Sequence, residues 1–146
     1  MHNAQWWVDD GVGFEGRGAV AENDYGAKDI QKRTLAFGVD IVNFVDTLPS
    51  STAGQAVGRQ IVRSGTAVGA LMEEADAAES RADFIHKVSI SLKEARETRY
   101  WLRLVLKSKL NEKMDRSATI RLGQEADELV RILFAIRSST RENSTK

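Results

Sequence analysis

The chain has 146 residues, which is enough for one domain with a sizeable hydrophobic core and too few for two. It carries 21 Lys and Arg residues against 21 Asp and Glu residues, so no overall field draws it toward nucleic acid or an anionic membrane. The absence of cysteine excludes disulfides, thiolate chemistry and cysteine-bound zinc. Because no apolar run reaches about 20 residues and no signal peptide is recognisable, we expect a cytoplasmic protein.

Residues 1–27 are rich in glycine and show no helical periodicity, so we expect them to form a flexible N-terminal extension. The adjacent Trp6 and Trp7 are unusual in a purely disordered arm and could anchor it against a neighbour. The spacing of Gly11, Gly13 and Gly16 matches a dinucleotide-binding fingerprint. No buried strand precedes this motif and no helix follows it, so we interpret the match as chance.

The first helix is predicted to begin near Lys28 or Asp29, because an apolar stripe with alternating spacings of four and three starts there. Pro49 is expected to end it, and Ser50, Ser51 or Thr52 to cap the next helix. The stripe consists of Ile30, Thr34, Phe37, Ile41, Phe44 and Leu48.

A second helix is predicted from Thr52 to Ala78, with a seam of smaller residues. The seam comprises Val57, Ile61, Ser64, Val68, Leu71, Ala75 and Ala78, and the same segment contains Gly54, Gly58, Gly65 and Gly69. Each interior glycine costs a helix about 1 kcal/mol relative to alanine, which indicates close approach of a neighbouring helix. For Gly54 and Gly58 a kinked or frayed helix start is the alternative.

A third helix is predicted to start at Ser80, which forms a capping box with Asp83, and to run to about Lys109. Its stripe consists of Phe84, Val88, Ser91, Ala95, Thr98, Leu102 and Val105, broadened by Ile85 and Leu92. Asp115 or Ser117 can cap a fourth helix. That helix directs Leu122, Ala126, Leu129, Leu133 and Ile136 inward, and residues 139–146 read as a frayed polar tail.

Four amphipathic helices with short connections predict an all-α, up-down-up-down antiparallel four-helix bundle over residues 28–138. Several apolar side chains lie off the main seams and could serve self-association, or could simply broaden the internal face. They are Val39, Val42, Trp101, Val130, Ile132 and Phe134.

Residues 63–104 carry a family resemblance that spans about 29–137 and is strongest over 60–104. The segments that carry it are Arg63-Ser64-Gly65-Thr66, Val68-Gly69-Ala70, Glu74-Ala75, Ser80, Asp83-Phe84-Ile85, Lys87, Leu92–Thr98 and Tyr100-Trp101-Leu102. In these segments the chain resembles the bacterial four-helix bundle family encoded by intervening sequences in 23S ribosomal RNA genes. Ala67, Leu71 and Glu73 depart from the pattern, and Leu71 suggests altered packing.

The resemblance implies a homo-oligomer, commonly a barrel-shaped pentameric ring, without enzymatic activity and without a cofactor. Relatives of the family include the accessory protein of diversity-generating retroelements, which works beside a reverse transcriptase on RNA. That relative is markedly basic, whereas this chain carries no net charge.

A nucleic-acid surface is suggested by four cations that recur at helical spacing, Arg96, Arg99, Arg103 and Lys107. None of them has an acidic residue four positions earlier, and in a ring they would repeat as a basic band able to contact phosphates. Arg59 and Arg63 might extend this band. The alternative is that Glu73, Glu74, Glu94 or Glu97 pair with these cations and neutralise the surface.

No set of residues forms a convincing catalytic or metal site. Asp83 and His86 have the carboxylate-x-x-histidine spacing of di-iron bundles, but the required second motif is missing, since the other histidine is His2. Two function classes therefore remain. They are an oligomeric interaction scaffold, which we favour, and a nucleic-acid-binding accessory protein.

Overall fold

The computed structural model describes residues 27–143, with four long helices. They are α1 (Ala27–Val45), α2 (Thr52–Asp76), α3 (Arg81–Lys107) and α4 (Arg116–Glu142), and a short 3₁₀ helix, η2 (Lys109–Lys113), joins the last two. The expectations for residues 1–26, including Trp6, Trp7 and the glycine motif, lie outside the described residues.

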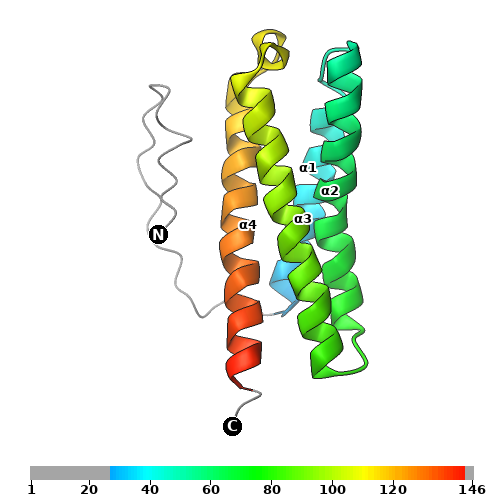
Figure 1. Cartoon of the computed structure of the whole chain (residues 1–146), viewed down its shortest axis with the longest axis vertical. Helices are drawn as coiled ribbons and strands as arrows, with labels where there is room; N and C mark the ends of the chain where they lie inside the picture. Colours follow the sequence, from blue (N-terminus) through cyan, green and yellow to red (C-terminus); the bar gives the residue numbers. More distant parts are fainter. Residues whose placement is uncertain (1–26, 144–146) are drawn as a thin grey trace.

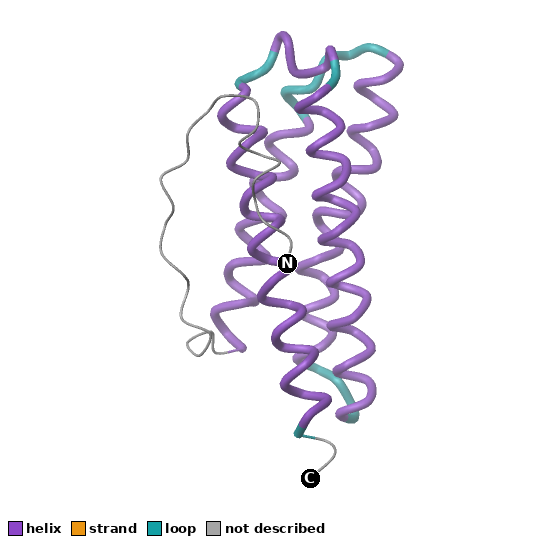
Figure 2. Tube along the Cα trace, turned by 60° about the vertical axis from the view of Figure 1, so that its left-hand side comes forward, coloured by secondary structure: helices purple, strands orange, loops and turns teal. Residues whose placement is uncertain are grey.

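The helices lie side by side as an elongated bundle, and residues 27–143 contain no strand (Figure 1). Connections between successive helices lie at opposite ends of the bundle, so each helix runs antiparallel to the one before it (Figure 2). Successive helices pack extensively, whereas α1 and α4 meet over a smaller area. The predicted all-α four-helix bundle is confirmed.

The predicted stripes form the core. Every residue of the first stripe is buried, and so are the central members of the other three, with one exception. Leu71, predicted to lie in the seam of the second helix, is only partly buried, and the neighbouring Met72 occupies the core instead. Phe84, Val57 and Ile136 pack against this core while remaining partly exposed. Burial of the four stripes against one another supplies the main stabilisation, because an isolated amphipathic helix of this length is marginal in water.

The glycines of α2 allow α1 to approach closely, as the sequence predicts. A Cβ atom added to Gly65 would lie 2.8 Å from two side-chain carbons of Ile41. One added to Gly69 would lie 3.1 Å from the carbonyl oxygen of Thr34. The alternative of a frayed helix start does not apply at Gly54, because α2 is helical from Thr52 and Ser51 caps it.

Side-chain caps fix the helix boundaries. The hydroxyl of Ser80 accepts a hydrogen bond from the amide of Asp83, and the carboxylate of Asp83 accepts one from the amide of Glu79. At the start of α4, the carboxylate of Asp115 accepts from the amide of Ser117 at 3.0 Å, so Asp115 is the cap. The hydroxyl of Ser117 donates a hydrogen bond to the same carboxylate, and this bond holds the pKa of Asp115 below its ordinary value.

The ends of the helices differ from the sequence prediction by a few residues. α2 ends at Asp76 and α3 at Lys107, each two residues before the predicted end. α1 ends at Val45, before Pro49, and a turn in which Thr47 and Leu48 bond back to the helix follows. α4 continues to Glu142, four residues beyond the predicted end of the bundle. The Thr140 hydroxyl donates a hydrogen bond to the carbonyl of Ile136 within α4. Arg81 of α3 donates one to the carbonyl of Asn143, which joins the end of α4 to α3.

The off-seam apolar residues divide into two groups. Val39, Val42 and Phe134 are about half exposed, at 51%, 45% and 48%. Val130 is buried, and Ile132 and Trp101 pack against the core, so these three broaden the internal face. No helix among residues 27–143 is both long and apolar enough to span a bilayer.

Candidate nucleic-acid interface

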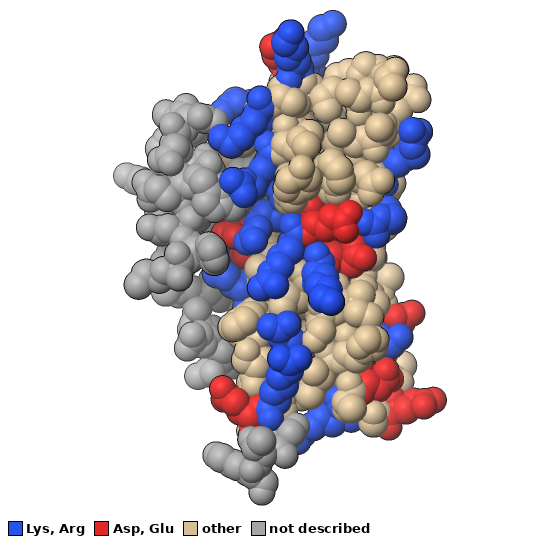
Figure 3. Space-filling model, viewed as in Figure 1, with Lys and Arg blue, Asp and Glu red and all other residues tan. Residues whose placement is uncertain are grey.

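The cations of α3 lie along the side of that helix that faces α4. Arg99 donates to the Asp127 carboxylate of α4 at 2.8 Å, which fixes the direction of this side. Arg96 and Lys107 are exposed, and Arg103 is partly buried. Figure 3 shows Lys and Arg side chains along the length of the face where α3 and α4 lie in Figure 1. The predicted spacing therefore does bring Arg96, Arg99, Arg103 and Lys107 onto one face.

Arg63 of α2 lies between α2 and α3, at the edge of α3 opposite the one that faces α4. Its guanidinium is 3.3 Å from the Glu94 carboxylate and also donates to Glu97. The Glu97 carboxylate accepts a further hydrogen bond from the indole of Trp101 at 3.2 Å. Arg63 therefore takes the arrangement that the sequence left open as the alternative, in which glutamates from a neighbouring helix pair with the arginine.

These bonds shift the pKa values of both partners in the direction that favours the ion pair. The hydrogen bond from Arg63 lowers the pKa of Glu97, and the hydrogen bond to Glu97 raises the pKa of Arg63. Arg59 is exposed on α2, one helical turn before Arg63 and on the same helix. Arg59 and Arg63 both belong to α2, so neither of them continues the row of cations along α3.

Sequence reasoning missed Asp127, the acidic partner of this row. Its side chain is 7% exposed, accepts a hydrogen bond from Arg99 and forms an ion pair at 3.2 Å with Arg131, one turn along α4. A buried carboxylate is tolerable only when it is paired in this way. Its position next to the seam residue Ala126, with Arg131 four residues later, is the sequence signal that could have revealed it.

The α4 contribution to the basic face was also missed. Phe134, Arg137 and Arg141 follow one another at spacings of three and four, so they lie along one stripe of α4. The Arg137 guanidinium carbon lies 5.3 Å from the centroid of the Phe134 ring, which is cation–π geometry. The pKa of Arg137 is lowered by burial and by the charges of Arg141 and Arg96.

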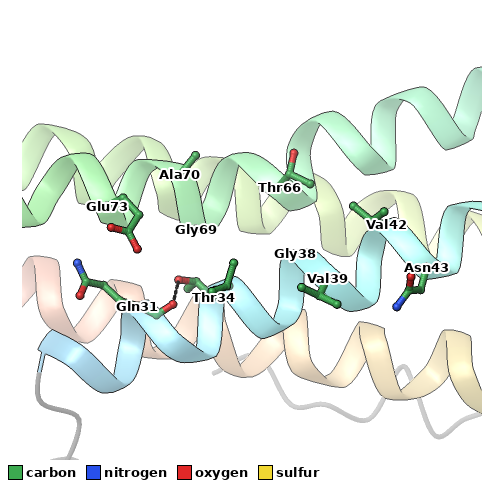
Figure 4. Close-up of a pocket in the computed structure, with 11 residues that line it drawn as sticks. Gln31, Thr34, Gly38, Val39, Val42, Asn43, Thr66, Gly69, Ala70 and Glu73 are labelled. Carbon is green, nitrogen blue, oxygen red and sulfur yellow. Dashed lines mark hydrogen bonds between the residues drawn. The ribbon is translucent and has the colours of Figure 1, made fainter.

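A second surface feature is an apolar groove of about 450 Å³ between α1 and α2. Figure 4 shows Val39 and Val42 of α1 opposite Thr66, Gly69 and Ala70 of α2. Leu35 lines the groove too and is 65% exposed, the most exposed of the large apolar residues among those described. Thr66, Gly69 and Ala70 of α2 have small side chains, so they leave the apolar side chains of α1 in the groove uncovered.

The described residues offer little for catalysis. Asp83 is a helix cap and His86, three residues later, is exposed. Within residues 27–143 no group of three or more His, Asp or Glu side chains could hold a metal ion. The described titratable groups whose pKa values are shifted are two ion-paired residues of the α2–α3 edge, one helix cap, and two arginines that pack against neighbouring helices.

Fold and surface together define a class of protein, an all-α four-helix bundle with a basic α3–α4 face and an apolar α1–α2 groove. The family model of the 23S rRNA-intervening sequence protein matches residues 27–135, and the chain belongs to this family. The family expected from the resemblance is thereby confirmed.

The chain is also similar to a solved crystal structure from Bacteroides thetaiotaomicron VPI-5482, described as a protein of unknown function from the S23 ribosomal protein family. The two are 37% identical with a TM-score of 0.68, and the match covers 77% of this chain and 97% of that one. A search of curated proteins gave no match.

Proposed function

We propose that the chain is a non-enzymatic, homo-oligomeric helical scaffold that assembles through the α1–α2 groove. The observation that carries this proposal is the exposure of Leu35, Val39 and Val42 in one row, at 65%, 51% and 45%. Contiguous apolar patches on a soluble protein commonly mark contact surfaces. A pentameric ring, as the family resemblance implies, would use two different surfaces of each copy and close on itself.

Light scattering tests the assembly. At micromolar concentration we expect a mass near five times the 16.2 kDa of one chain. Changing both Leu35 and Val39 to lysine should lower the mass to that of one chain, because each charge would be buried without a partner. Ala36→Lys adds a charge to an exposed position of α1 outside the groove and should leave the mass unchanged. A wild-type mass near 16 kDa would contradict the proposal.

A second candidate function is that of a nucleic-acid-binding accessory protein, acting with a reverse transcriptase. The α3–α4 face favours it, because no carboxylate among the described residues forms an ion pair with Arg96, Lys107, Arg137 or Arg141. Unpaired cations on one face are the footprint of a phosphate-binding surface.

Binding to labelled RNA and DNA across a salt series tests this candidate. We expect affinity to fall steeply with salt, with a logarithmic slope of about −0.7 for each phosphate contacted on a single strand. Arg96→Glu with Lys107→Glu should weaken binding without unfolding the bundle, since both residues are exposed. Lys32→Glu makes the same kind of charge change on α1 and serves as the control. Absence of binding at low salt would exclude this function.

A further inference from the structure

An arginine cluster lies where the C-terminal half of α4 meets α3. We use this name for Arg96, Arg137 and Arg141, which come from both helices. Arg137 and Arg141 are one turn apart on α4. Arg96 is exposed on α3, one turn from Arg99, which bonds Asp127 of α4, so Arg96 lies on the side of α3 that faces α4. Arg96 and Arg141 are exposed and Arg137 is partly buried, and no described carboxylate forms an ion pair with any of the three.

The central arginine of the cluster is held in place by an aromatic ring. Arg137 stacks over Phe134, and its Nε atom is buried with no hydrogen-bond partner among the described residues. Phe134 remains 48% exposed, so part of its ring faces solvent beside Arg137.

This combination selects a ligand that is both anionic and aromatic. The guanidinium groups suit phosphate oxygens, to which arginine donates in a planar fork. The Phe134 ring and the stacked guanidinium plane suit the face of a nucleobase. A duplex hides its base faces within the stack, whereas a single strand offers base faces and phosphates together.

We propose that the arginine cluster and Phe134 form an anchor for single-stranded nucleic acid. One base stacks against Phe134 and the guanidinium of Arg137, while Arg96 and Arg141 contact the flanking phosphates. This inference rests on the second candidate function and gives it a strand specificity and a position on the bundle.

Fluorescence anisotropy with the full chain tests the anchor, using a labelled 20-nucleotide oligouridine and a blunt RNA duplex of equal length. Phe134→Leu keeps an apolar side chain of similar bulk but removes the ring. Because one stacked base contributes about 1–3 kcal/mol, we expect affinity for the single strand to fall roughly 5- to 150-fold. Affinity for the duplex should change less than twofold.

Charge reversal tests the phosphate contacts. Arg96→Glu with Arg141→Glu should abolish detectable single-strand binding, whereas two neutral changes, Arg96→Gln with Arg141→Gln, should reduce the logarithmic salt slope by about 1.4. Lys32→Glu with Arg121→Glu makes the same change in net charge at two exposed positions outside the cluster and is the control for the double charge reversal. Far-ultraviolet circular dichroism establishes that each variant keeps its helical content.

The outcomes separate the two proposals. If the wild-type chain binds single strands and Phe134→Leu binds them equally well, the anchor is refuted while nucleic-acid binding stands. Equal affinity of the wild type for duplex and single strand would also refute the anchor. If the wild type binds neither RNA at low salt, both proposals fail.

Discussion

Single residues set the fit between α1 and α2. Gly65 has no room for a β-carbon, because the Ile41 side chain fills the space at 2.8 Å. Gly38, on the opposing helix, is different: a Cβ atom there would lie 4.0 Å from the Cα atom of Thr66, which is ordinary contact. Two helical glycines in the same interface thus have opposite packing constraints.

Gly65→Ala should destabilise the protein by about 1–3 kcal/mol from overpacking, offset in part by about 1 kcal/mol of helix propensity. Gly38→Ala should instead be neutral or stabilising by up to about 1 kcal/mol, since it gains the propensity without the clash. Urea unfolding followed by circular dichroism measures both. If Gly65→Ala raised the unfolding midpoint as much as Gly38→Ala, the close-packing argument would be wrong.

Glu97 should make stability depend on pH. The hydrogen bond from Arg63 lowers the pKa of Glu97 below its ordinary value of 4.5 in the folded protein. The unfolded chain therefore takes up this proton at higher pH than the folded protein does. The stabilisation is complete above about pH 4.5 and is lost as the pH falls through the folded pKa.

Glu97→Gln should consequently lose less stability than the wild type between pH 6 and pH 3, as measured by urea unfolding. Glu79 forms no ion pair with the described residues, so Glu79→Gln serves as the control and should follow the wild type. Identical pH profiles for all three proteins would refute the role of the Arg63–Glu97 contact.

At the scale of elements, α4 has two chemically different edges. Toward α1 it presents Glu125 and Glu128, which both accept from Arg33. Toward α3 it presents the buried Asp127, which pairs with Arg99. These two edges orient the helix about its axis, because a rotation would bury one set of carboxylates without partners.

The start of α4 depends on its cap. Asp115→Ala removes the acceptor for the Ser117 amide and should destabilise the protein by about 1 kcal/mol. Asp115→Asn keeps an acceptor oxygen and should cost less than half as much. Thermal unfolding of the two variants compares them directly, and equal losses would show that the cap bond is unimportant.

At the scale of the whole molecule, the contact between α1 and α4 closes the bundle and is smaller than the contacts between successive long helices. The two helices leave a surface hollow of about 530 Å³ between them. Arg33 bridges α1 to α4, with its Nε atom 2.6 Å from Glu125, and these bonds raise the pKa of Arg33. Closure thus relies more on polar bonds than the other interfaces do.

Arg33→Met should increase hydrogen exchange in α1 more than in α3, because it leaves the pair of carboxylates on α4 unpaired. Mass spectrometry of the exchanged peptides measures the difference. Lys32→Met, at the neighbouring exposed position, should leave exchange in α1 unchanged. Uniform acceleration over all four helices would instead mean that α1 does not open separately.

The fold could be predicted because apolar periodicity, caps and short connections are local signals that agree with one another. The candidate site could be predicted only in part. The spacing of Arg96, Arg99, Arg103 and Lys107 is local, but pairing between helices depends on their rotation in three dimensions. For that reason the pairing of Arg99 with Asp127 was not foreseen.

The close packing of Gly65 on Ile41 also links two positions that are 24 residues apart in the sequence. A larger residue at position 65 can be accommodated only if position 41 becomes smaller at the same time. Relatives of this chain should therefore change these two positions together, with a fixed total volume. Correlated substitutions at positions 41 and 65 among relatives would therefore be the evolutionary signature of this helix contact.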